Sequence, residues 1–175
     1  MNDTSCSCYF CRASAQHQMK LDEFETSDEL QSSVPCCKLC LAYYQLDRLS
    51  PGSDKIIHMP GLSKTALSHL IRAIHIAEQS SDERIRDEAS QIRRWLLDHA
   101  DYVQNSGLRT DNPVAFHAVV QRTSPEARQN MLSDLALYMS ADSVGKLPLK
   151  WAEDAPNTRN WTEHYNEFKR HELKG

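Results

Sequence analysis

Two Cys-x-x-Cys pairs lie in the first quarter of this 175-residue sequence, and they constrain its fold more than any other feature. The first pair is Cys8 and Cys11, and the second is Cys37 and Cys40. Two intervening residues allow a tight knuckle, or the first turn of a helix, to point both sulfurs of a pair toward one small tetrahedral ion. Together the pairs predict a four-thiolate site that holds one structural Zn²⁺ per chain.

Two further cysteines, Cys6 and Cys36, lie just before the pairs. They are spare thiols, or they replace a neighbouring cysteine in an alternative ligand register. A disulfide framework and thiols that fill a core are the other interpretations of six cysteines. Residues 1–6 lack the basic and apolar regions of a signal peptide, and no apolar run approaches about 18 residues. We therefore expect a cytoplasmic protein, whose thiols stay reduced and available to metal.

The segments around the second pair predict a hairpin followed by a helix. Residues 16–24 alternate loosely, with Met19 and Leu21 on one side, which predicts one or two short strands. Residues 41–49 carry apolar side chains at helical spacing until Ser50-Pro51-Gly52. Knuckle, hairpin and helix, in this order, are the plan of a treble-clef zinc finger. Metal ligation then substitutes for a core that about fifty residues cannot build alone.

The following segments predict one more strand and then helices. Residues 55–60 form a short apolar run closed by proline, which predicts a strand that packs on the zinc unit. Ser63 is a candidate N-cap for a helix with one apolar face. Residues 80–83, Ser-Ser-Asp-Glu, have the composition of a capping box for an antiparallel second helix, which is expected to end at residues 105–107.

Proline at a favoured first position predicts two more helices, at Asn112-Pro113 and Ser124-Pro125. The second is expected to run through Leu135 to Tyr138 or Met139, and the chain then loosens over residues 141–145. A last helix carries an aromatic stripe that belongs to the core or docks on a partner: Trp161, Tyr165 and Phe168.

These elements predict an α+β, mostly helical fold. Residues 1–60 form the treble-clef, HNH-like zinc unit with its short β-hairpin. Residues 61–175 form a bundle of about four to five helices packed on that unit, so that the two parts make one compact domain.

Composition gives no support to nucleic-acid binding. The formal net charge is -4 and the isoelectric point is near 6.0, so the chain has no general attraction for phosphate backbones. The outward face of the second predicted helix mixes both signs: Asp82, Glu83, Arg84, Arg86, Asp87, Glu88, Arg93 and Arg94. This face is a solvated one with i,i+4 pairs or a phosphate-binding stripe, and the interleaved acids favour the former.

Catalysis by an HNH-type treble clef requires a general-base histidine on a strand between the pairs, beside a second metal-binding side chain. His17 is the only histidine in that interval, and it has no histidine or asparagine companion there. We interpret His17 as an ordinary strand residue, and we expect no catalytic and no organic cofactor-binding residues. Four thiolates around the zinc would also leave no open position at which to activate water.

Three parts of the sequence matter together: the zinc unit, the run of residues 56–67 (Ile-Ile-His-Met-Pro-Gly-Leu-Ser-Lys-Thr-Ala-Leu) that leads into a helix, and residues 112–116 (Asn-Pro-Val-Ala-Phe). In this order they resemble the IcmJ (DotN) family of Dot/Icm type IVB secretion systems. The resemblance extends from the first cysteine pair to about Trp151. It implies a degenerate HNH-like zinc fold without nuclease chemistry. It also implies that the metal ligands are Cys8, Cys11, Cys37 and Cys40.

The resemblance further implies a subunit of the cytoplasmic coupling complex, recruited to the inner membrane through the secretion system. Its partners would be an extended tail of the coupling ATPase and other subunits of that complex. An HNH-like nuclease or a DNA-binding zinc protein of conjugative transfer is the alternative. The partner would bind in a groove at the junction of the zinc unit and the helices. The candidate lining residues of this groove are Tyr43, Tyr44, Ile57, Met59 and Leu62. The alternative is that these side chains only pack the two parts of the chain together.

Overall fold

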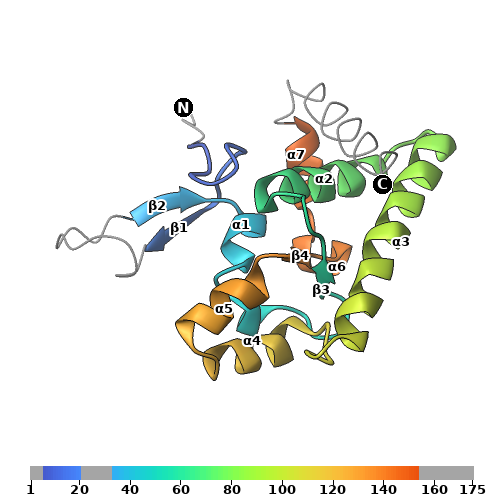
Figure 1. The fold of residues 1–175 in the computed structure, drawn as a ribbon. Helices are drawn as coiled ribbons and strands as arrows, with labels where there is room; N and C mark the ends of the chain where they lie inside the picture. The colour runs from blue at the N-terminus through green and yellow to red at the C-terminus, as the bar shows by residue number, and fades with distance from the viewer. Residues whose placement is uncertain (1–5, 21–32, 154–175) are drawn as a thin grey trace.

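The computed structural model describes residues 6–20 and 33–153, which form an α+β arrangement composed mostly of helices (Figure 1). In chain order the elements are β1 (His17–Lys20), β2 (Ser33–Cys36), α1 (Lys38–Ala42), the 3₁₀ turn η1 (Leu46–Arg48), β3 (Lys55–His58), α2 (Lys64–Ala77), α3 (Glu83–Asn105), α4 (Pro113–Gln121), α5 (Pro125–Leu132), β4 (Leu135–Tyr138), α6 (Ala141–Val144) and α7 (Leu147–Glu153).

The hairpin expected between the cysteine pairs is present. β1 and β2 are antiparallel, with Met19 opposite Val34, and both of these side chains are buried. In Figure 1 the hairpin projects from the body of the protein, beside α1. Residues 21–24 of the predicted strands lie outside the described residues.

The helix predicted after the second pair is shorter than expected. α1 ends at Ala42, and the apolar pattern of residues 41–49 is divided between α1 and the separate turn η1. Gln45, between them, has a φ of -133° and a ψ of 46°, which is outside helical geometry. An apolar pattern at helical spacing over nine residues is therefore compatible with two short turns.

The second sheet contains a strand that the sequence did not predict. The expected strand over residues 55–60 is β3, and its antiparallel partner is β4, with Ile56 opposite Leu137. The prediction that the fourth helix runs through Leu135 to Tyr138 is therefore wrong, because α5 ends at Leu132. A short run that is buried on both sides has no polar alternation, so its pattern does not distinguish a strand from a buried helix.

The helix starts were predicted correctly. The Ser63 hydroxyl accepts the N–H of Ala66, and the Asp82 carboxylate accepts the N–H of Arg84, at 3.1 and 3.0 Å respectively. Asn112 likewise caps α4, with Pro113 in its first turn, and Ser124 caps α5. These side chains satisfy N–H groups that have no partner within the helix.

The helical region is not a simple bundle. α2 and α3 are in contact, as expected of neighbours, but their axes cross steeply in Figure 1 and are not antiparallel, and α3 packs mainly on β3. One such contact stacks His58 on Tyr102, with ring centroids 4.2 Å apart. The chain also does not loosen over residues 141–145, because Ser140 caps the short helix α6. The stripe of Trp161, Tyr165 and Phe168 lies outside the described residues.

One continuous cluster of buried side chains runs from Cys8, through β3 and α2, to Trp151. It includes all four cysteines of the two pairs.

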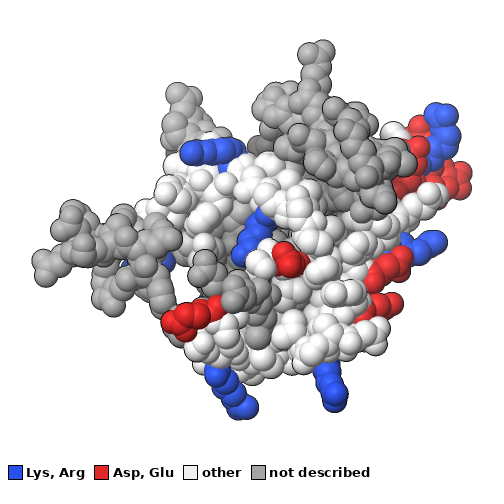
Figure 2. Space-filling view, viewed as in Figure 1, with Lys and Arg blue, Asp and Glu red and all other residues white. Residues whose placement is uncertain are grey.

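Acidic and basic side chains lie together along α3 in Figure 2, without a patch of a single sign on that helix. The face predicted for α3 therefore carries charges of both signs at the surface, as expected.

A buried carboxylate joins the loop before β3 to the start of α6. Asp54 is 0% exposed, and its oxygens accept the N–H groups of Ser50 and Ser140 at 2.9 and 2.8 Å. The hydroxyls of Ser140 and Ser143 donate to it as well, at 2.9 and 2.6 Å. A buried charge is tolerated where several donors surround it, so Asp54 acts as a structural link.

Replacing Asp54 with alanine is expected to lower the free energy of unfolding by about 3 kcal/mol, because two partly buried backbone N–H groups and two hydroxyls lose their acceptor. Urea denaturation of Asp54→Ala measures the loss. Asp47→Ala, at an exposed position of η1, is the matched control and should shift the midpoint little. Equal midpoints for the two variants would show that Asp54 has no structural role.

Candidate metal centre

The first cysteine pair lies on a tight knuckle. The N–H of Cys8 donates to the carbonyl of Ala13, and the N–H of Arg12 donates to the carbonyl of Cys8, at 2.6 and 2.9 Å. Arg12 has a φ of 62°, in the left-handed region, which turns the chain directly after Cys11. A bond from the Tyr9 N–H to the Pro35 carbonyl, 2.9 Å long, fastens the knuckle to β2. The hairpin thereby holds the first pair close to the second.

The second pair lies at the start of α1. Cys37 is the N-cap residue, and its Sγ accepts the N–H of Cys40 at 3.5 Å. Cys40 follows in the first turn of the helix, so both sulfurs of the pair point to the same side. The hairpin end and the helix start are consecutive in the chain, with Cys36 in β2 and Cys37 as the cap.

The four paired cysteines meet in one buried cluster. The Sγ atoms of Cys8, Cys11, Cys37 and Cys40 all lie within 4.8 Å of one another. The Sγ atoms of Cys11 and Cys37 are 3.6 Å apart, far beyond the length of a disulfide. Four thiolates around a tetrahedral ion with metal–sulfur bonds of about 2.3 Å are about 3.8 Å apart. These residues therefore fit a single metal ion bound by four cysteines.

The two other cysteines lie outside this cluster. Cys6 is exposed, whereas Cys36 is buried and its thiol donates to the Cys37 carbonyl at 3.4 Å. Burial, followed by the nearby sulfur of Cys8, raises the pKa of Cys36 to about 12. All six cysteines are free thiols, so the described geometry contains no disulfide framework.

Hydrogen bonds among the clustered sulfurs favour one thiolate strongly. The thiols of Cys37 and Cys40 hold the pKa of Cys11 well below its usual value, and the Arg72 guanidinium acts in the same direction against the effect of burial. The same contacts with Cys11 and Cys37 raise the pKa of Cys40. The surroundings of Cys11 therefore favour its thiolate, and ionised sulfur is the form that binds metal.

Arg72 is the functional residue that the sequence did not reveal. Arginine side chains usually lie at the surface, but Arg72 is 2% exposed and its Nη2 donates to the Sγ of Cys37 at 2.8 Å. Both Nη atoms lie 3.6 Å from the Sγ of Cys11. Trp151 covers the guanidinium, with Cζ 5.3 Å from its ring centroid. Ser68 and His75 are buried beside it on α2, but three polar side chains at helical steps are not a sequence signal for burial.

Charge balance explains the position of Arg72. Burial alone would lower the pKa of its guanidinium, but the sulfurs of Cys37 and Cys11 outweigh burial and raise it. Four thiolates with one divalent ion would carry a net charge of -2, and a buried negative charge requires a partner. Arg72 supplies one positive charge from α2, and so connects the metal centre to the helical region.

His17 is exposed on β1, opposite Cys36. In residues 6–20 and 33–153, the cysteine cluster is the only group of three or more histidine, cysteine, aspartate or glutamate side chains placed to hold a metal ion. The described residues therefore give His17 no companion metal-binding set.

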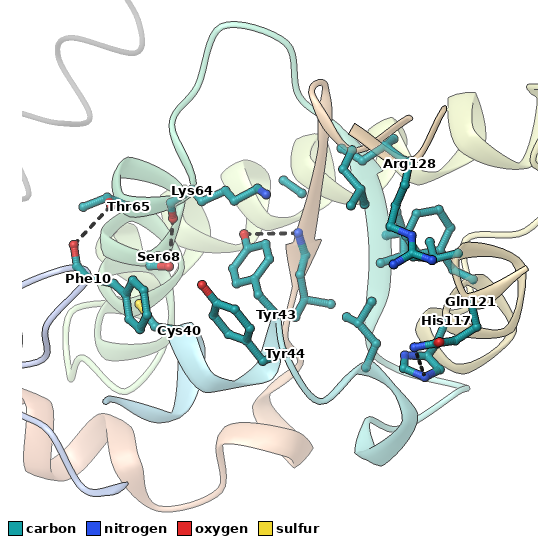
Figure 3. Close-up of a pocket in the computed structure, with 18 residues that line it drawn as sticks. Phe10, Cys40, Tyr43, Tyr44, Lys64, Thr65, Ser68, His117, Gln121 and Arg128 are labelled. Atoms are coloured by element: carbon teal, nitrogen blue, oxygen red, sulfur yellow. Dashed lines mark hydrogen bonds between the residues drawn. The ribbon is translucent and has the colours of Figure 1, made fainter. Parts of the chain in front are cut away.

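The five residues predicted to form a partner groove separate into two groups. Ile57 and Met59 are 0% and 6% exposed and belong to the core, so they pack the two parts of the chain together. Tyr44 is 58% exposed, and Leu62 is half-buried. Tyr43 and Tyr44 line a cavity of about 630 Å³ between α1 and α2 on one side and α4 and α5 on the other (Figure 3).

No model of a known protein family matches the chain. No curated protein matches it in sequence either. None of the helices in the described ranges is long and apolar enough to cross a lipid bilayer.

Proposed function

We propose that the four clustered cysteines bind one structural Zn²⁺ and that the protein is a non-enzymatic adaptor. The observation that carries this proposal is the closed donor set, because the chain itself supplies four buried sulfurs within 4.8 Å of one another. Zinc bound by four cysteines is typical of structural sites, since catalytic zinc keeps one position open for water. The bound ion would stabilise the fold and supply no chemistry to a substrate.

The zinc unit is a treble clef in this proposal. Its support is the order of a knuckle at Cys8 and Cys11, the β1–β2 hairpin, and a helix that begins at Cys37. The two pairs are linked through the backbone bond between Tyr9 and Pro35, as a compact finger requires.

The adaptor would serve in the coupling complex of a Dot/Icm-like type IVB secretion system, where it binds the coupling ATPase and helps to recruit substrates. This part rests on the resemblance of residues 8–151 to the IcmJ (DotN) family, and the mixed charges of α3 agree with a protein partner better than with DNA. Affinity purification of the tagged full chain from its native cell, followed by quantitative mass spectrometry, tests it. We expect the coupling ATPase among the enriched proteins. Enrichment without any secretion component would contradict it.

An HNH-like nuclease would behave differently. We expect the zinc-loaded wild-type protein to leave supercoiled plasmid DNA uncut in Mg²⁺ or Mn²⁺, and His17→Ala to match it. If His17 were a general base, removing it would lower cleavage by a factor of about 10² to 10⁴. Metal-dependent cutting by the wild type that is lost in His17→Ala would replace the adaptor with a nuclease.

A further inference from the structure

The cavity of Figure 3 lies along the outer edge of β4. The Met59 N–H donates to the Asp134 carbonyl at 2.8 Å, so these two residues form a hydrogen-bonded pair next to the sheet. Hydrogen-bonded and non-hydrogen-bonded pairs alternate along an antiparallel ladder. In the observed register, Leu135 and Leu137 are therefore in non-hydrogen-bonded pairs and turn their N–H and C=O groups away from β3. Both residues line the cavity.

This edge is only partly satisfied. The Leu137 N–H donates to the Tyr43 hydroxyl at 3.3 Å, so a side-chain oxygen occupies the place of a neighbouring strand's carbonyl (Figure 3). Among the described backbone and side-chain groups, no hydrogen bond reaches the N–H of Leu135 or the carbonyls of Leu135 and Leu137. A strand edge that has no neighbouring strand and borders a cavity can act as a template for another strand.

The charges of the cavity indicate what it would accept. Lys64 and Arg128 line it, and no aspartate or glutamate is among its described lining residues, although the whole chain carries a net charge of -4. Neither cation forms a salt bridge within the described part of the chain. The Lys64 Nζ lies 5.6 Å from the ring centroid of Tyr43, and the buried Nε of Arg128 has no partner among the described groups. The occupant should therefore carry a carboxylate.

The rest of the lining is apolar and aromatic. Phe10 and Tyr44 lie on the side of α1, with ring centroids 5.6 Å apart, and Phe116, Val120 and Leu132 lie on the side of α4 and α5. Such a wall favours an occupant with apolar side chains. In an extended peptide, alternate residues point to the same side, so an apolar residue can face this wall while the backbone bonds to β4.

We propose that this cavity binds an extended peptide, which adds to the outer edge of β4 as a third strand and places an acidic side chain against Lys64 or Arg128. The proposal rests on the adaptor function and names the surface and the partner chemistry for it. The peptide's carbonyl would accept the Leu135 N–H, and its own N–H groups would donate to the Leu135 and Leu137 carbonyls. An apolar side chain of the peptide would occupy the aromatic wall.

The test begins with a phage-displayed library of random nine-residue peptides selected on the zinc-loaded full chain. Enriched peptides should alternate apolar residues and include at least one aspartate or glutamate. A synthetic enriched peptide should bind Lys64→Glu/Arg128→Glu at least about tenfold more weakly than the wild type in fluorescence anisotropy, because two attractions become repulsions. Arg94→Glu/Lys146→Glu makes the same change of charge at exposed positions outside the cavity and should leave the Kd unchanged.

Amide hydrogen exchange measured by NMR distinguishes strand addition from other binding. Saturating peptide should slow the exchange of the Leu135 N–H by about tenfold or more. Unchanged exchange at Leu135, equal weakening in both double variants, or no enriched peptide would each overturn the proposal. Binding of decanoate in place of any selected peptide would assign the cavity to a small apolar acid.

The two proposals fail in different ways. If the coupling ATPase co-purifies equally with the wild type and with Lys64→Glu/Arg128→Glu, the adaptor stands and the β4 edge is not its site. If selected peptides protect Leu135 but no secretion component co-purifies, the peptide site stands and the secretion role fails.

Discussion

Replacing Cys37 with serine is expected to abolish stoichiometric metal binding and to unfold the segment from the knuckle to α1. Serine retains an N-cap oxygen, so α1 loses a metal ligand and keeps its cap. Ligation by a structural zinc site is worth on the order of 10 kcal/mol in small zinc peptides, which exceeds what a short hairpin and a five-residue helix supply. Zinc content by elemental analysis, and amide exchange of residues 6–42 by mass spectrometry, measure the two effects.

Cys36→Ser is the matched control for Cys37→Ser. Cys36 is the adjacent residue and is equally buried, but its sulfur lies outside the cluster of four. This variant should keep one zinc per chain. Loss of zinc in Cys36→Ser, or retention of zinc in Cys37→Ser, would mean that the ligand register differs from the one described.

Replacing Arg72 with methionine is expected to weaken metal binding by about 10- to 100-fold, the usual effect of removing an outer partner of metal ligands. The bound centre then keeps its net negative charge in the interior without the guanidinium that lies 2.8 Å from Cys37. Competition with a chromophoric chelator measures the affinity and the rate of metal release. Arg72→Lys keeps the positive charge but loses the forked contacts to two sulfurs. Its metal affinity should therefore lie between those of the wild type and Arg72→Met.

Arg93→Met is the control for an arginine that serves a structural ion pair. Arg93 Nε donates to Glu78 at 2.7 Å, away from the cysteines. The Arg93→Met variant should have a slightly changed free energy of unfolding and an unchanged metal affinity. If Arg72→Met bound zinc as tightly as the wild type, Arg72 would be a packing residue without an electrostatic role at the centre.

Local signals predicted the ligand cluster and the helix starts. Cys-x-x-Cys spacing dictates which sulfurs can share an ion, and Ser63, Asp82 and Asn112 cap helices through bonds to the next few residues. Such features depend on neighbours in the chain, so the sequence alone contains them.

Features that depend on distant contacts were missed. β4 is a strand because its backbone pairs with β3, and in the pair of Ile57 and Ala136 the two residues are 79 positions apart in the sequence. The sequence pattern alone assigned this segment to a helix, which is wrong. Arg72 is buried because α2 packs against the cysteine cluster, and helical periodicity alone places an arginine at the surface. Ile57 and Met59 were candidate groove residues, but α3 and β4 enclose their strand.

The metal content and coordination of the wild-type chain test the central claim most directly. Protein purified without chelator should contain one zinc per chain, and X-ray absorption should show four sulfur neighbours at about 2.3 Å. Metal-free protein, or a zinc with nitrogen or oxygen neighbours, would contradict a closed four-cysteine centre.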